Sequence, residues 1–196
     1  MAGIRGTLSQ EEIKRTLEPK LPKFLRCAEL RLGELEVLSG RITFGFHLAA
    51  NGSVTSVQAN KSTLGDRATE RCMVDVAQAT RFPEPHGGEA DFTWPLELPL
   101  DPSVRAPVDL PTELAQPVSS TRRQGASPGE LLQSSCGGGS YVVTAYIDPA
   151  GHVLASGAAT PDPATAPELD CITAGVRDWT FPSPGSYLGK LSFTVP

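Results

Sequence analysis

The sequence repeats itself at a spacing of 99 residues, and this repeat constrains the fold more than any other feature. Gly52 is matched by Gly151 (151 − 52 = 99), and Cys72 is matched by Cys171. The same offset, without a gap, aligns Val54 with Val153, Ala59 with Ala158, Phe82 with Phe181, Pro83 with Pro182 and Pro85 with Pro184. Such a repeat predicts that the chain contains two copies of one small module.

The repeat breaks upstream of the first strand of each copy. Cys27 lies 15 residues before Ile42 (42 − 27), whereas Cys136 lies five before Tyr141 (141 − 136), so the second copy is ten residues shorter there (15 − 5). Between the copies, closely spaced prolines are typical of a semi-rigid, partly extended linker. We therefore expect the following parts: a first module over residues 1–99, a Pro-rich linker over residues 100–126 and a second, shortened module over residues 127–196.

Each copy has the pattern helix, strand, strand, helix, strand. Ser9 and Glu12 have the spacing of a capping box, and Pro19 and Pro22 predict a break in the amphipathic helix that follows. The apolar period changes to two from residue 41, and Asn51-Gly52 predicts a hairpin turn. The predicted fold class is α+β: two tandem modules, each with a three-stranded antiparallel sheet packed on helices.

The long helix and the closing strand of each copy follow the hairpin. Asp66 is a suitable N-cap for a helix to about residue 80, and Pro167 opens the counterpart, which runs to Trp179. Closing strands are expected over residues 91–98 and 189–195. Because Pro95 has no N–H to donate to a ladder, the first closing strand is predicted to lie at the edge of its sheet.

Cysteine spacing leaves two interpretations open. Cys27, Cys72, Cys136 and Cys171 are far apart and form no CxxC pair, which argues against a zinc site built from all four. Disulfides formed in an oxidising compartment remain possible, as do buried thiols.

Composition and motifs argue against several function classes. A net charge of −5 and a pI of about 5.2 give no overall field that attracts nucleic acid or anionic lipid. No apolar run approaches the roughly 20 residues that span a bilayer. The start of the chain has no signal-peptide pattern, which suggests a fragment whose export signal or membrane anchor lies upstream.

Residues for catalysis or cofactor binding are also not indicated. His47, His86 and His152 occupy polar positions of strands or turns, without a second ligand at helical spacing or a nucleophile elbow. The glycines at 137–139 lack the Gly-Lys-Ser/Thr ending of a phosphate-binding loop, so a flexible joint is the better interpretation. We expect no enzyme activity, no metal and no cofactor.

The segment GRITFGFHLAANGSV, continuing to ATRFPEP and DFTWPLEL, resembles the C-terminal domain of TonB. The shared pattern is a Gly-led strand, an (Asn/Asp)-Gly turn, a helix ending in Phe-Pro and a closing strand. With EEIKRTLEPKLPKFLRCAE included, the chain is more specifically similar to the AgmX/PglI C-terminal domain of myxobacterial gliding-motility proteins, in which cysteines matching Cys27 and Cys72 recur together. The similarity covers residues 7–98, and residues 130–196 more weakly.

This resemblance implies a non-enzymatic, periplasmic interaction module of a trans-envelope motility or energy-transduction complex, from a membrane-anchored protein. It implies two disulfides, Cys27–Cys72 and Cys136–Cys171, each tying the helix before the first strand to the long helix of its own module. Partners would be envelope or outer-membrane proteins, bound by strand addition to the edge strand. The expected partner-binding residues are Phe92, Thr93, Trp94 and Leu96.

Two departures from the family pattern concern the second copy and the start of the chain. The second copy lacks most of the first helix and has CGGGS as its connector, and the N-terminal membrane anchor expected of a TonB-like protein is not present in this stretch. The alternative function is a free-standing structural envelope protein or a cell-wall-associated scaffold without force transfer. The identity of the partner and the oligomeric state stay open.

Overall fold

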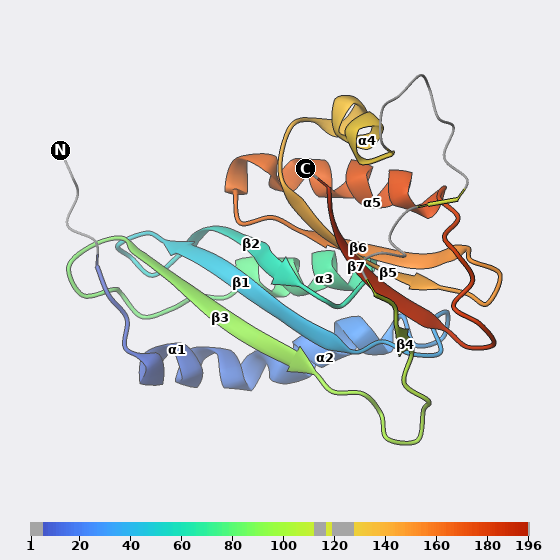
Figure 1. The fold of residues 1–196 in the computed structure, drawn as a ribbon. Coiled ribbons are helices and arrows are strands. Elements are labelled where there is room, and N and C mark those ends of the chain that lie inside the picture. The colour runs from blue at the N-terminus through green and yellow to red at the C-terminus, as the bar shows by residue number, and fades with distance from the viewer. Residues whose placement is uncertain (1–5, 112–116, 119–127, 196) are drawn as a thin grey trace.

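A computed structural model of the chain describes residues 6–111, 117–118 and 128–195 (Figure 1). The predicted α+β class is confirmed: helices pack on two sheets, one of order β2-β1-β3 and one of order β4-β7-β5-β6. The elements of the first half are α1 (Gln10–Leu17), the 3₁₀ helix η1 (Glu18–Lys20), α2 (Leu21–Glu29), β1 (Gly40–Leu48), β2 (Val54–Ser62), α3 (Arg67–Gln78) and β3 (Ala90–Leu98).

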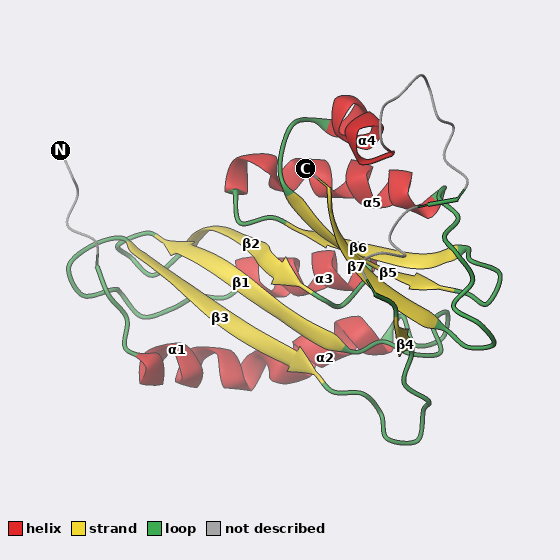
Figure 2. Ribbon diagram, in the orientation of Figure 1, coloured by secondary structure: helices red, strands yellow, loops and turns green. Residues whose placement is uncertain are grey.

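The second half repeats this order in shortened form (Figure 2). Its elements are β4 (Val108–Asp109), α4 (Pro128–Cys136), β5 (Tyr141–Ile147), β6 (Val153–Ala159), the 3₁₀ helix η3 (Pro163–Glu168), α5 (Leu169–Arg177) and β7 (Gly189–Val195).

Local signals account for the boundaries of the N-terminal helices. The Ser9 side chain accepts a hydrogen bond from the Glu12 N–H, and the Glu12 carboxylate accepts one from the Ser9 N–H, so the predicted capping box is confirmed. The predicted break is the single 3₁₀ turn η1, which contains Pro19. Pro22 lies in the first turn of α2, where its missing N–H costs no hydrogen bond.

Aromatic side chains fill the space between the N-terminal helices and the first sheet. Phe24 of α2 is fully buried, with its ring centroid 5.6 Å from that of Phe44 in β1 and 5.4 Å from that of Trp94 in β3. These contacts anchor α2 beneath the centre of the sheet, on the face away from its polar side chains.

Both expected disulfides are present. Cys27–Cys72 joins α2 to α3, and Cys136–Cys171 joins α4 to α5. The pairing is therefore within each module, and no free cysteine remains among the described residues. Two such cross-links are typical of proteins that fold in an oxidising compartment outside the cytoplasm.

The second sheet differs from the three strands that the sequence predicts. Part of the segment assigned to the linker forms β4, which pairs in parallel with β7 through Val108 and Asp109. The helix that was expected to open at Pro167 also differs. Asp162 caps the 3₁₀ turn η3, which contains Pro167, and α5 begins only after it at Leu169, because proline lacks the N–H that a continuous helix needs.

The two modules share a buried junction. Tyr146, Ala155 and Ala159 of the second module belong to the hydrophobic core of the first. The main-chain N–H of Thr160 donates a hydrogen bond of 3.1 Å to the carbonyl of Ala59, which joins the end of β6 to the outer side of β2. The two modules are therefore in direct contact and are joined by more than the linker.

Candidate functional site: the open edge and polar face of the first sheet

Strand β3 is an edge strand, as Pro95 predicts. Among the described strands it pairs with β1 alone, and no described residue pairs with its outer side between Thr93 and Leu98. An unpaired edge exposes main-chain donors and acceptors that another extended chain can use.

The direction of the main-chain groups of β3 follows from the pairing of β1 on its other side. The Arg41 carbonyl accepts from the Thr63 N–H, at the β2 side of the sheet. Residues in an antiparallel ladder alternate between facing one neighbour and the other, so Gly45 also directs its main-chain groups to β2. Its partner across β1 and β3 is Thr93. The N–H and carbonyl of Thr93 therefore point away from β1, out of the open edge.

Pro95 obeys the same alternation. Pro95 lies opposite Thr43, and Thr43 is two residues before Gly45 in β1. The nitrogen of Pro95 therefore also faces outward, so its missing N–H removes no hydrogen bond between β1 and β3. The open edge thus offers N–H donors at Thr93 and Glu97, separated by an acceptor-only position at Pro95.

The side chains that the sequence assigned to partner binding divide between the two faces of β3. Thr93 is exposed. Phe92, Trp94 and Leu96 instead point to the helix side; Leu96 is buried, and the Phe92 ring stacks on Phe46 with centroids 4.8 Å apart. These three side chains pack toward the core, so the edge presents the main chain of β3 and not these side chains.

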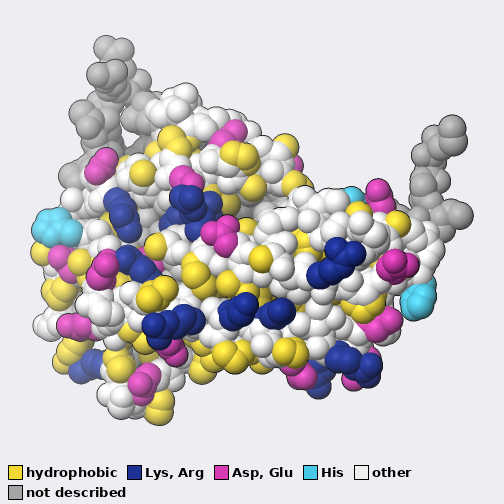
Figure 3. All heavy atoms as spheres, turned by 180° about the vertical axis from the view of Figure 1, so that it is seen from behind, with side chains coloured by type: hydrophobic (Ala, Val, Ile, Leu, Met, Phe, Trp, Pro, Cys, Tyr) yellow, Lys and Arg dark blue, Asp and Glu magenta, His cyan; other side chains and the backbone are white. Residues whose placement is uncertain are grey.

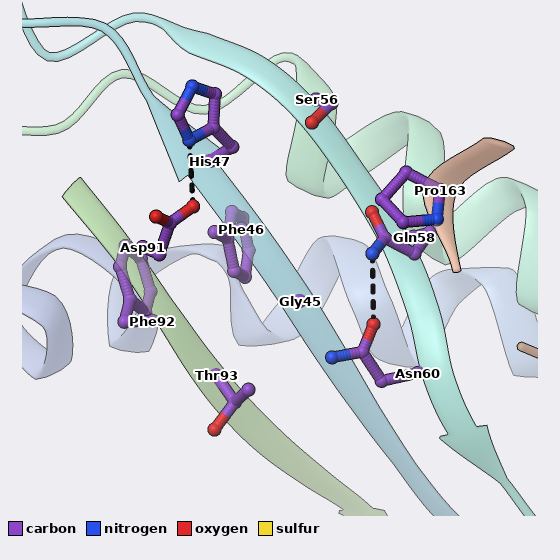
Figure 4. Close-up of a pocket in the computed structure, with 10 residues that line it drawn as sticks. All are labelled: Gly45, Phe46, His47, Ser56, Gln58, Asn60, Asp91, Phe92, Thr93 and Pro163. Atoms are coloured by element: carbon purple, nitrogen blue, oxygen red, sulfur yellow. Dashed lines mark hydrogen bonds and ion pairs between the residues drawn. The ribbon is translucent and has the colours of Figure 1, made fainter. Parts of the chain in front are cut away.

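A polar groove of about 410 Å³ lies on the open face of the first sheet, next to the edge (Figure 4). From β1 and β3, the His47 Nδ1 and the Asp91 Oδ1 lie 2.7 Å apart. From β2, the Gln58 Nε2 donates a hydrogen bond of 3.0 Å to the Asn60 Oδ1. Gly45 lies between these pairs, and its missing side chain leaves room for the Asn60 amide, which a Cβ there would meet at 2.4 Å.

The groove extends from Thr93 at the open edge to Pro163, which the second module contributes from η3. An extended chain added to β3 would place every second side chain on this face. The polar groups of the groove therefore lie beside the edge, where side chains of such an added strand would be placed.

The second module shows the corresponding edge in an occupied state. By the 99-residue offset, β7 corresponds to β3 and Leu188 to Glu89 (188 − 99). The Val108 N–H donates to the Leu188 carbonyl, and the Leu110 N–H donates to the Lys190 carbonyl, each at 2.8 Å. A segment of the chain itself thus adds a strand to the edge of β7.

The first module has only the beginning of this arrangement. The Gly6 N–H donates to the Glu89 carbonyl, the counterpart of the bond from Val108 to Leu188. This bond lies at the start of β3, before Thr93. In the second module β4 pairs with the edge of β7 at Gly189 and Lys190, and in the first no described residue pairs with the outer side of β3 from Thr93 onward.

No group of three His, Cys, Asp or Glu side chains within the described ranges is arranged to hold a metal ion, and no described helix is long and apolar enough to cross a membrane. Seen from behind, Lys and Arg side chains are interspersed with Asp and Glu, with hydrophobic side chains exposed between them (Figure 3). Such a mixed surface does not form the single-sign patch typical of nucleic-acid binding.

Comparisons with known proteins found no matching family model, no matching curated protein and no matching solved structure.

Sequence reasoning did not identify the polar groove or β4. The alternating polar residues in β1 and β2 indicate an exposed face of the sheet. The position of the Asn60 side chain over Gly45 depends on a bulge in β2, which the sequence does not reveal. The two-residue strand β4 is too short to give a periodic signal.

Proposed function

We propose that the chain is a non-enzymatic interaction module that binds an extended segment of a partner protein by strand addition to β3. The observation that carries this proposal is that β3 has outward main-chain groups at Thr93 with no described neighbour; the strand β4, added to the edge of β7, is a precedent within the chain. Main-chain pairing supplies affinity in such complexes, and alternate side chains supply specificity.

The cellular setting that we propose is the periplasm, in a trans-envelope motility or energy-transduction complex with envelope or outer-membrane proteins as partners. Two disulfides support an extracytoplasmic location. The TonB-like pattern of residues 40–98 is the support for force or energy transmission. Residues that precede Met1 in the native gene separate this role from that of a free-standing scaffold: a transmembrane helix with cytoplasmic domains supports transmission, and a lipoprotein signal supports the scaffold.

The test of strand addition uses the Thr93→Pro variant. Proline removes the outward N–H and leaves the β1 ladder intact, so it should preserve folding and remove one main-chain bond to the added strand. Thr93→Val, which keeps the N–H and a β-branched shape, is the matched control. The probes are fluorescein-labelled peptides selected from a random phage-displayed library on the wild-type chain.

We expect the selected peptides to bind the wild type and Thr93→Val alike, and to bind Thr93→Pro about tenfold more weakly or worse, since an added strand loses a donor and gains a steric clash. Amide chemical shifts should change along residues 90–98. Equal binding to Thr93→Pro, with shift changes confined to the helical residues 14–31, would exclude the edge and move the binding surface to the basic helix face.

A further inference from the structure

An apolar groove of about 350 Å³ lies at the end of the open edge, between α2 and the chain that follows β3. Leu25 of α2 and Leu32 just after it form one wall and are 39% and 49% exposed. Leu98, the last residue of β3, forms the opposite wall together with Leu100. Leucine side chains exposed together in a hollow are a typical anchor site for an apolar side chain of a partner.

The charged residues that line this groove are acidic, and one of them, Glu29, is paired with Arg26 at 3.2 Å. Its lining includes the carboxylates of Glu29, Glu36 and Asp101, and neither Lys nor Arg. Hydrogen bonds from the Ser103 hydroxyl and main-chain N–H hold the pKa of Asp101 below its usual value, so this carboxylate stays ionised at neutral pH. An apolar hollow with an acidic rim fits an apolar side chain that has Lys or Arg beside it.

The groove is continuous with the edge strand. A chain that pairs with Thr93 and runs in the direction of β3 reaches the level of Leu98 after about five residues, or about 17 Å at the rise of a strand. The parallel direction has a precedent within this chain, because β4 runs parallel to β7.

We propose that the groove holds an apolar side chain of the partner segment, flanked by Lys or Arg, about five residues after the residue that pairs with Thr93. This inference rests on the proposed strand addition and deepens it. The partner is thereby defined as a protein with an extended stretch followed by a basic-apolar-basic sequence, bound parallel to β3.

The test places a charge in the groove while leaving the edge intact. Leu32→Glu introduces a carboxylate among the groove leucines, and Leu30→Glu is the matched control, because Leu30 is 62% exposed and does not line the groove. Both positions are exposed, so both variants should fold. The probes are again the phage-selected peptides, with binding measured by fluorescence anisotropy.

We expect selected sequences to carry the basic-apolar-basic motif. Leu32→Glu should weaken their binding about tenfold, because burying the apolar side chain beside a carboxylate costs desolvation, and Leu30→Glu should change binding less than about twofold. Replacing Glu36 and Asp101 with Lys should weaken binding further, and added salt should weaken wild-type binding.

The outcomes separate this inference from the proposed function. If Thr93→Pro weakens binding and Leu32→Glu does not, the proposed role of the groove is wrong and strand addition is retained. The reverse dependence would overturn strand addition, and with it the parallel arrangement. A concentration-dependent dimer of the wild type that Leu32→Glu dissociates in sedimentation would assign the groove to a second copy of this chain and overturn the inference.

Discussion

The Glu70 carboxylate and the main-chain N–H of Ala158 form a hydrogen bond of 3.0 Å across the junction between the two modules. The other oxygen of Glu70 accepts a hydrogen bond of 2.6 Å from the Ser62 hydroxyl. Burial raises the pKa of Glu70 to about 7, since the loss of hydration outweighs the two hydrogen bonds and the nearby charge of Arg67, which lower it.

Glu70 should make the stability of the chain depend on pH. Its folded-state pKa of about 7 lies above the ordinary value of 4.5, so the folded state binds this proton more tightly than the unfolded state does. The free energy of unfolding should therefore fall as pH rises between these two values, by on the order of 3 kcal/mol in total, and should change little from this cause above them.

The measurement is urea unfolding of the wild type and Glu70→Gln at about pH 5 and pH 8. Glutamine keeps an acceptor for Ala158 and offers Ser62 a donor, so it should abolish the difference that Glu70 causes. An identical pH dependence in both proteins would show that the pKa of Glu70 is not raised in the folded state.

Gly157→Ala should destabilise the same junction. A Cβ at this position would lie 2.3 Å from the Glu70 Oε1 and 2.8 Å from the Asp66 nitrogen. We expect a loss on the order of 1–3 kcal/mol in the free energy of unfolding, as for other overpacked cores. The control is Gly138→Ala, where a Cβ meets no atom within 4 Å, and a similar loss there would rule out the steric explanation.

Each disulfide should stabilise the folded state. The cross-links close sequence separations of 45 and 35 residues, for which removal by paired Cys→Ala substitutions should cost about 2–4 kcal/mol each. Thermal unfolding with and without reductant measures this effect. Alkylation of four thiols, detected by mass spectrometry in protein exported to the periplasm, would contradict the cross-links.

Trypsin should cut the linker first. The predicted site, Arg122-Arg123, lies outside the described residues, and exposed polar linkers are preferred cleavage sites. Because Tyr146 and Ala155 enter the core of the first module, we expect the two fragments to remain associated during size-exclusion chromatography. Separate elution would mean that the junction is too weak to hold the modules together without the covalent link.

The parts of the fold that the sequence predicts are local. The capping box at Ser9, the Asn51-Gly52 hairpin and the edge position of Pro95 each depend on a few neighbouring residues, so their chemistry alone decides the conformation. The 99-residue repeat then carries the interpretation from the first module to the second. The within-module disulfides follow from the same repeat together with the TonB-like pattern.

The parts that the sequence does not predict are pairings between distant segments. Glu70 has the sequence features of an exposed helical residue, and only the approach of Gly157 and Ala158 buries it. The outward direction of the Thr93 amide depends on which residues of β1 face β2, which is a matter of register. The register between two strands cannot be read from the amino-acid composition.

The asymmetric surroundings of the first sheet limit how many chains can join it. On the β2 side the Thr160 N–H of the second module caps Ala59, while β3 forms the opposite margin. Because the second module lies against the β2 side, the β3 margin is the one that a partner strand would reach, which favours a one-to-one stoichiometry. If two copies of this chain paired through β3, both would use the same margin, and the product would be a closed twofold dimer and not a growing fibre.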